Sequence, residues 1–348
     1  MNDTIANSTE SHGLQNPALD GAFIVLSIFI LIINSIVIYL FFSREYLQTK
    51  TNSLLVSLAV SDLMVGLLGI PLNIACNAVT VYRDQVCYAA ALTYRLQAVS
   101  EMAHIFVTTI ERYIYVMYPM KYIRIVTAPR ILKVMGSVWC FSIFVAFIQF
   151  AWNNPNEILG MPTPTRMVYD AVYNIFGALV CFLLPLIVMI ISYSRLFVVI
   201  HRQIKEIHLQ NYPRSGSGSQ RAPVATEARA ISIFALMLSI FTLAWSSWYI
   251  MSFSFFFGFY QHLSDHLLDF LDFFRFSVAF INPILYTFLK RDFARAFKSL
   301  VMREGVRPRE FVTSTRLKSR GFASTSMQTR MSNSYGDENP ITANGNTA

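Results

Sequence analysis

Apolar residues along the chain gather in long runs that are separated by short polar stretches. Seven runs come near or exceed the roughly 20 residues that a helix needs to cross a bilayer. They lie near residues 22–42, 53–76, 88–113, 134–151, 171–200, 229–258 and 264–289. Because lipid offers the backbone no hydrogen-bond partners, such runs cross a membrane as helices. The pattern predicts an all-α membrane protein, a bundle of seven transmembrane helices.

The polar remainder divides the rest of the chain. We expect residues 1–21 to form an N-terminal segment outside the seven-transmembrane domain of residues 22–289. Residues 290–301 combine basic and apolar residues in a pattern that predicts a short amphipathic helix. Residues 302–348 are rich in Ser, Thr and Arg, a composition typical of a disordered tail. With 54% hydrophobic and 14% charged residues, the chain does not have the composition of soluble domains.

The basic residues indicate the orientation. With the N-terminus outside, the outer segments hold only Arg83 and Arg166, and most other Lys and Arg residues face the cytoplasm, as the positive-inside rule requires. The net charge of +8 therefore reflects topology and does not call for a nucleic-acid partner. Asn2 and Asn7 each begin a glycosylation sequon, in agreement with an extracellular N-terminus.

Particular residues recur through the spans in a recognisable order. They are Asn34, Asp62, Glu111 to Tyr113, Trp139, Pro185, Tyr193, Phe241, Trp245 and the "NPILY" of Asn282 to Tyr286. Together they resemble a rhodopsin-like (class A) G-protein-coupled receptor, and the pattern is nearest to the amine and adenosine receptor branch. The resemblance covers about residues 20 to 300. It implies a plasma-membrane receptor that signals to a heterotrimeric G protein.

Three positions depart from the family pattern. Tyr94 stands where amine receptors carry an acidic anchor, so a protonated amine loses its usual counter-ion. Phe276 stands where opsins carry the retinal-linking Lys, which leaves a light-sensing Schiff base unsupported. Ser247 replaces the proline that bends the sixth span in most members.

Glu111 and Arg112 have two interpretations. Arg112 can be an interfacial residue that reaches to water, with Glu111 beside it by accident. The resemblance instead implies that Arg112 pairs with Glu227, at the inner start of the sixth span, and that separating them opens a cleft for a G protein. The other residues that the resemblance assigns to this switch are Tyr193, Asn282, Pro283 and Tyr286.

Asp62 places a carboxylate in the middle of the membrane, where an unpaired charge is costly. The family uses this residue to hold sodium. Here the neighbouring position in the third span is Glu101, so two carboxylates come close together. The pattern predicts either a sodium ion held by Asp62, Glu101 and Asn282, or a proton shared between the carboxylates without metal.

Charged and aromatic residues meet near the outer ends of the third, sixth and seventh spans. Asp272 and Arg275 share one helix face, which favours either an ion pair that fixes packing or a ligand cavity that carries both signs of charge. Such a cavity would suit a zwitterionic, anionic or polar small ligand, and a cationic amine could still use Asp272. The predicted ligand-binding residues are Tyr94, Arg95, Trp245, Trp248, Tyr249, Asp272 and Arg275.

The chain has 4 cysteines, and the expected second extracellular loop contains none of them. Cys87 therefore lacks the partner that the family supplies from that loop. Cys76 and Cys87 each lie fourteen residues outward of Asp62 or Glu101, about 21 Å by helical rise. They can pair with each other if their Cα atoms approach within about 7 Å; otherwise both are free thiols.

No catalytic set emerges from the sequence, and we expect neither enzymatic activity nor a cofactor other than the candidate sodium ion. A small-molecule receptor is the favoured interpretation. The buried charges leave an ion- or proton-coupled transporter as an alternative, and a constitutively active or ligand-independent receptor as another. The expected partners are an extracellular ligand, a G protein, arrestin and a receptor kinase at the tail, and membrane lipids.

Overall fold

The fold was analysed in a computed structural model of the chain, which describes residues 17–156, 162–210, 218–256 and 263–302. The helical stretches 207–210, 218–227 and 255–256 are described as backbone only. All of these residues belong to the first of two compact units, Met1–Glu304, and the second unit, Gly305–Ala348, lies outside the described residues. The predicted tail and the two sequons, Asn2 and Asn7, also lie outside them.

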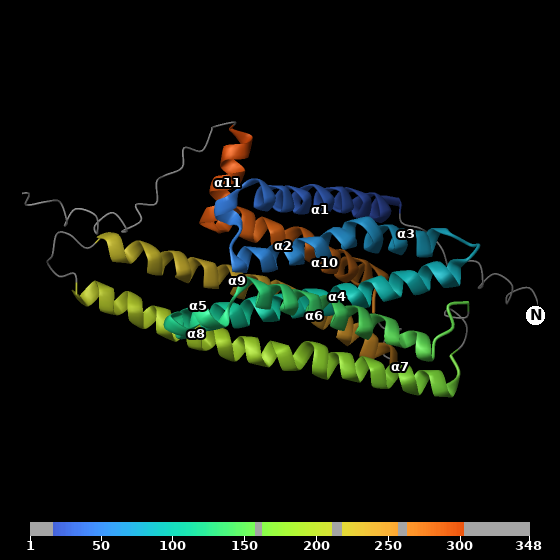
Figure 1. Cartoon of the computed structure of the whole chain (residues 1–348). Coiled ribbons are helices and arrows are strands. Elements are labelled where there is room, and N and C mark those ends of the chain that lie inside the picture. Colours follow the sequence, from blue (N-terminus) through green and yellow to red (C-terminus); the bar gives the residue numbers. More distant parts are fainter. Residues whose placement is uncertain (1–16, 157–161, 211–217, 257–262, 303–348) are drawn as a thin grey trace, which may run out of the picture. The chain divides into compact units, whose positions relative to one another are not determined.

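Every regular element in the described part of the chain is a helix (Figure 1). The α-helices are α1 (Pro17–Ser43), α2 (Lys50–Met64), α3 (Ile70–Ala78), α4 (Arg83–Met117), α5 (Pro119–Ile125), α6 (Ala128–Phe147), α7 (Pro164–Phe176), α8 (Leu184–Gln210), α9 (Gly218–Phe256), α10 (Asp265–Ile284) and α11 (Arg291–Val301). Short 3₁₀ turns, η2 (Glu45–Leu47) and η4 (Ile148–Ala151), follow α1 and α6.

Within the described residues, five helical stretches are long and apolar enough to cross a membrane. They are Pro17–Ser43, Lys50–Ala78, Ala128–Ala151, Pro164–Glu206 and Ala228–Ser254. The long helices α4 and α10 carry several charged residues along their length, which lowers their mean hydropathy. These are the helices on which most of the candidate functional residues lie.

Packing contacts close the long helices into a ring. α1 contacts α2 and α10, α2 contacts α4, α4 contacts α8 and α9, α8 contacts α9, and α9 contacts α10. α6 packs against α2 and α4. Because α4 contacts so many of the other helices, its side chains can join contacts from several parts of the chain.

The helices bury one face and expose another that is also apolar. On α1, Ile30 and Val37 are fully buried, whereas Ile24, Ile28 and Ile32 are each 51% exposed. In water such an exposed apolar face would be unfavourable, but in a bilayer it contacts lipid chains. This arrangement explains why the apolar runs show little helical periodicity.

Two π-helical turns widen the bundle next to prolines. η3 (Val65–Gly69) ends two residues before Pro71, and η5 (Gly177–Leu183) ends two residues before Pro185. Proline has no N–H and its ring presses on the carbonyl four residues earlier, so the preceding turn loosens. The sequence therefore determines where these two helices widen.

Pro283, inside α10, leaves a backbone carbonyl that needs another hydrogen-bond donor. Its missing N–H leaves the carbonyl of Ala279 without its usual helical partner. The Nδ2 group of Asn34, on α1, donates to that carbonyl at 3.1 Å and to Ile30 O at 3.0 Å. A polar residue of α1 thus satisfies a backbone group that a proline of α10 leaves without its helical partner. α10 then continues into a third π-turn, η7 (Leu285–Leu289).

Candidate functional site

At one end of the bundle, Arg112 is held inward by a buried carboxylate. The Nε and Nη2 atoms of Arg112 donate to Glu111 at 2.7 and 3.1 Å, and Nη2 also donates to the hydroxyl of Thr51. The guanidinium carbon lies 4.9 Å from the ring centroid of Tyr115. Arg112 is 7% exposed and Glu111 3%, so the pair is largely removed from water.

Glu111 also accepts hydrogen bonds from two residues outside α4. Thr51, on α2, donates to Oε1 at 2.9 Å, and Tyr122, on α5, donates to the same atom at 2.6 Å. A buried carboxylate needs this number of donors to offset the loss of hydration. Burial and the bond to Glu111 raise the pKa of Tyr122, so its phenol stays a neutral donor. We call Thr51, Glu111, Arg112 and Tyr122 the arginine network.

Of two predicted partners of Arg112, the structure describes the side chain of Tyr193 but not that of Glu227. Glu227 falls within α9, but its side chain lies outside the described residues, so its contact with Arg112 stays a prediction. Tyr193, on α8, is buried and accepts a hydrogen bond from Thr109 at 3.0 Å. That bond ties α8 to α4 one turn from the arginine network.

A polar cluster fills the middle of the bundle. Glu101 accepts from Asn282 Nδ2 at 2.7 Å and from Trp245 Nε1 at 3.4 Å, which joins α4 to α10 and α9. Asp62 is fully buried, and neither of its oxygens has a hydrogen-bond partner among the described residues. The oxygen of Asn282 and the hydroxyl of Tyr286 also have none there.

This cluster fits a bound cation or proton. An ionised carboxylate without partners is expensive in a medium that cannot solvate it. Asp62 and the carbonyl oxygen of Asn282 are hard oxygen donors of the kind that sodium prefers, and Glu101 is a second carboxylate, close enough to interact electrostatically with Asp62. A proton would equally relieve the repulsion between two carboxylates, so both alternatives remain predictions.

Near the other end of the bundle, Arg275 lies among aromatic rings. Its guanidinium carbon is 4.7 Å from the ring centroids of both Tyr94 and Trp248 and 5.8 Å from that of Trp245. Its Nη2 atom lies 3.0 Å from Asp272 Oδ1, within one face of α10. The Arg275 side chain is 3% exposed and that of Asp272 is 33% exposed, so the acid faces water while the cation does not.

Arg95 is the second cation at this end. It donates to the side chain of Gln149, on η4, and its guanidinium carbon lies 5.1 Å from the ring centroid of Tyr173, on α7. No carboxylate within salt-bridge distance of Arg95 occurs among the described residues. Among the described residues, its nearest partners are polar and aromatic groups, and the carboxylate of Asp170 acts on its charge from beyond salt-bridge distance.

A small cavity of about 40 Å³ separates these groups. Of the predicted ligand-binding residues, those that line it are Tyr94, Arg95, Trp245, Trp248 and Tyr249. Asp272 and Arg275 do not line this cavity, but Arg275 contacts its wall through Tyr94 and Trp248. In this conformation the cavity is too small for a drug-sized ligand.

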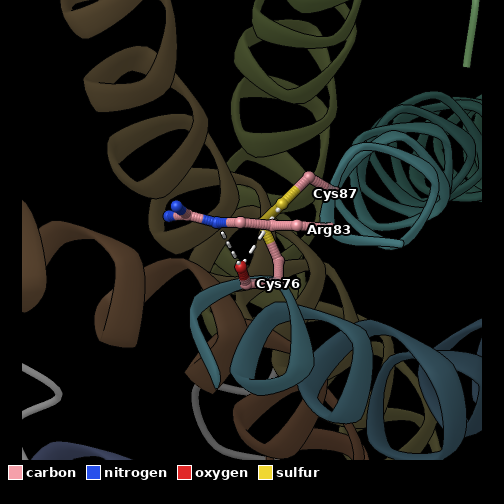
Figure 2. Close-up of a disulfide and its surroundings, with 3 residues drawn as sticks. All are labelled: Cys76, Arg83 and Cys87. Atoms are coloured by element: carbon pink, nitrogen blue, oxygen red, sulfur yellow. Dashed lines mark hydrogen bonds between the residues drawn. A yellow bond between two sulfur atoms is a disulfide. The ribbon is translucent and has the colours of Figure 1, made fainter. Parts of the chain in front are cut away.

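The end of α3 and the start of α4 are joined by a disulfide bond (Figure 2). Cys76 and Cys87 are linked with their Cα atoms 4.7 Å apart. Arg83 Nε donates to the Cys76 carbonyl at 3.2 Å, which braces the same loop. Cys140 and Cys181 are free.

Comparison with known proteins decides the family. The family described as "7 transmembrane receptor (rhodopsin family)" matches residues 33–286, which is more than half of the chain. The chain belongs to this receptor family. Human histamine H2 receptor is 29% identical over 306 residues, which cover 80% of this chain and 78% of the relative. Human adenosine receptor A2a is 25% identical over 299 residues, which cover 80% of this chain and 70% of the relative.

Family membership settles the class of activity. The protein is a G-protein-coupled receptor and a multi-pass membrane protein, and it is not an enzyme. The predicted resemblance to the rhodopsin family, and to its amine and adenosine branch, is confirmed by these matches. Receptors of this family generally need no cofactor for their activity.

Three residues of these sites were not predicted from the sequence. Thr51 and Tyr122 complete the shell of Glu111, and Gln149 is the partner of Arg95. Each belongs to a different element from the residue it contacts, so no spacing along the chain connects them. Gln149 had one available signal, since it is a polar residue in an otherwise apolar run.

Proposed function

We propose that this receptor lies in the plasma membrane with its N-terminus outside, binds a small extracellular ligand within the helix bundle and activates a heterotrimeric G protein. Seven membrane passes follow if α4 and α10 with η7 also cross the bilayer, and α11 then lies along the inner membrane surface. The observation that carries the proposal is the polar chain through the bundle. Glu101 contacts Trp245, which borders the outer cavity, and Asn282, which adjoins Pro283.

The chemistry of the outer cavity supports an anionic, zwitterionic or polar ligand. Arg95 and Arg275 bring two cations, whereas Asp272 is the carboxylate paired with Arg275. The related proteins are named as receptors for histamine and adenosine. Tyr94 lies against Arg275 here, so a ligand that displaces the guanidinium from its aromatic partners needs its own group for Arg275 or Asp272.

Arg112 is the proposed inner end of the switch. In this conformation Glu111, Thr51 and Tyr115 hold it, and we infer that Glu227 adds a contact from α9 in the resting state. Ligand binding would shift the population toward a state in which α9 moves away and Arg112 is released. Tyr193 and Tyr286 are then available to stabilise Arg112, and phosphorylation of the tail would recruit arrestin.

Asp62 and Glu101 are the residues through which we expect a bound cation or proton to regulate the proposed switch. A sodium ion or a shared proton between them would hold α2, α4 and α10 together, and its loss would loosen the resting state. The same carboxylates keep an ion- or proton-coupled pathway as a second candidate function, favoured by the unpartnered oxygens of Asp62.

A ligand screen with two readouts tests the proposal. Cells expressing the receptor are challenged with amines, nucleosides, amino acids, lipids and acid, while G-protein dissociation and ion currents are recorded. We expect a G-protein response to at least one class, and a shift of at least about tenfold in its half-maximal concentration in Arg95→Gln or Asp272→Asn, since a charge-assisted contact is lost.

The alternatives give different results in the same screen. If a validated ligand acts equally on wild type and both variants, the charged cavity is not the ligand site. An ion current that persists when G proteins are blocked would favour the pathway function. A G-protein response that is high without any ligand and insensitive to all classes would favour a constitutively active receptor.

A further inference from the structure

A larger cavity, of about 460 Å³, lies at the end of the bundle that holds Arg112. Its walls come from the start of α2, the end of α4, α5, α9 and the junction of η7 with α11. Five basic residues and one acidic residue line it: Lys50, Arg112, Arg229, Lys290, Arg291 and Asp292. We call it the basic cavity.

The positive charges of the basic cavity are only partly balanced nearby. Glu111 neutralises Arg112. Lys50 donates to the backbone carbonyl of Val126, and its Nζ atom lies 5.3 Å from the ring centroid of Tyr122; neither group carries a formal negative charge. An ammonium has three donors, so this hydrogen bond uses only one of the donors of Lys50.

Arg229 faces the cavity from α9. Its side chain is exposed, and it forms no hydrogen bond or ion pair within the described part of the chain. A guanidinium carries five donors in a planar fork that fits the oxygens of a phosphate. Lys50 and Arg229 therefore bring cationic donors to one cavity from two different helices.

Helix geometry adds to the positive potential. α2 begins at Lys50 and α11 at Arg291, and both residues line the cavity. The first turn of a helix leaves backbone N–H groups without helical partners and carries partial positive charge. In α2 the Thr49 side chain accepts from one of these groups, Asn52 N. Lys290, which precedes α11, gives the first turn of α11 no side-chain cap and instead donates to Asn52.

We propose that the basic cavity binds a multiply phosphorylated ring, either a free inositol phosphate or the headgroup of a phosphoinositide lipid. A volume of about 460 Å³ accommodates a ring with its phosphates. Because the cations come from several elements around the cavity, an anion with several phosphates can contact more of them than a single phosphate can. This site is distinct from the ligand cavity near Arg275 and does not depend on the receptor function proposed above.

Direct binding to the purified full-length protein tests the inference. In one arm, inositol 1,4,5-trisphosphate is titrated into the protein in detergent. In the other, the protein is placed in phosphatidylcholine nanodiscs that contain either phosphatidylinositol 4,5-bisphosphate or phosphatidylserine at equal total charge, and thermal stability is compared. We expect saturable binding in at least one arm and greater stability with the phosphoinositide; the arm that responds identifies the source.

Two single variants locate the site. Lys50→Gln and Arg229→Gln should each weaken binding about tenfold or more, as expected when one charge-assisted hydrogen bond is lost. Lys133→Gln, an exposed lysine of α6 outside the cavity, serves as the matched control and should bind as wild type. Arg229 is exposed, so its variant should keep the fold, which thermal denaturation without ligand verifies.

Three results would contradict binding of a phosphorylated ring in the basic cavity. Absence of saturable binding in both arms would overturn the inference. So would equal stabilisation by phosphatidylserine, because that would indicate a general surface-charge effect. Binding that Lys50→Gln and Arg229→Gln leave unchanged, or that Lys133→Gln weakens to the same extent, would place the anion elsewhere.

Discussion

At the scale of single residues, Glu111 determines how Arg112 is held. It pairs with Arg112 in this conformation, and it accepts from Thr51 and Tyr122 as well. A charged hydrogen bond contributes about 1.5–3 kcal/mol, and about 1.4 kcal/mol changes an equilibrium tenfold. Small changes in this shell can therefore shift the balance between resting and active states.

Glu111→Gln should raise basal G-protein activation severalfold. The substitution removes the negative charge that keeps Arg112 inward, so release of Arg112 costs less. Tyr122→Phe, which removes one donor to Glu111, should have the same sign and a smaller effect. Basal nucleotide exchange at matched surface expression measures both. Glu206→Gln, an exposed acid of α8, is the control, and equal activity in Glu111→Gln and wild type would contradict the role.

Arg275 should stabilise the outer half of the bundle by its planar shape as well as its charge. Its guanidinium lies against Tyr94 and Trp248 and pairs with Asp272. Removing both contributions in Arg275→Gln should cost about 2 kcal/mol, whereas Arg275→Lys, which keeps the charge but not the stacking, should cost less. Thermal denaturation in detergent distinguishes them. If Arg275→Lys is no more stable than Arg275→Gln, the positive charge contributes nothing to the stability of this site.

At the scale of helices, Asn34 and Pro283 should act as a pair. Pro283 leaves the Ala279 carbonyl without its helical donor, and Asn34 supplies a donor in its place. Asn34→Ala should therefore lower the free energy of unfolding by about 1–3 kcal/mol, because it leaves a buried acceptor without a hydrogen bond. In the Pro283→Ala background, the new N–H can bond to Ala279, and the cost of Asn34→Ala should fall. A double-mutant cycle measures this coupling. Equal costs in the two backgrounds would show that the contact carries no coupling.

The disulfide should hold the end of α3 and the start of α4 together. Cys76 and Cys87 are separated by 11 positions, and closing a loop of that length stabilises a fold by roughly 3 kcal/mol in the chain-entropy description. Cys76→Ser, Cys87→Ser and the double variant should therefore lose the same stability, while Cys140→Ser should lose none. A double variant that loses about twice as much as either single one would exclude a shared bond.

The apolar runs of the sequence indicated where long helices lie but did not define their ends. α1 begins at Pro17 and α4 extends to Met117, because polar turns continue a helix beyond its apolar part. The partners of Glu111 and Arg95 depend on how separate helices pack, and no pattern within one helix contains that information. Pro283 and Asn34 were each visible as family residues, but only packing revealed that they contact one carbonyl.

At the scale of the whole molecule, the central claim is that one end of the bundle senses a ligand and the other end acts on a G protein. The polar contacts of Trp245, Glu101 and Asn282 connect the cavity near Arg95 to the middle of the bundle. Each contact joins two different helices, so a shift of one helix changes the contacts of the next. A connection of this kind supports two arrangements of a packed core and suits a switch.

The predicted contact between Arg112 and Glu227 follows from the same claim. If Glu227 helps to hold α9 against α4, Glu227→Ala should raise basal signalling without any ligand. Combining it with Glu111→Gln should raise it further, since both substitutions release Arg112. Basal signalling that is unchanged or lower at equal expression would remove Glu227 from the switch.

The most direct measurement is nucleotide exchange on purified heterotrimeric G proteins by the receptor in nanodiscs, for wild type and Arg112→Ala. We expect the wild type to accelerate exchange on at least one G-protein class and Arg112→Ala to lose most of that acceleration at equal amounts of folded protein. Lys133→Ala should behave as wild type. Wild-type acceleration that Arg112→Ala retains in full would contradict the account.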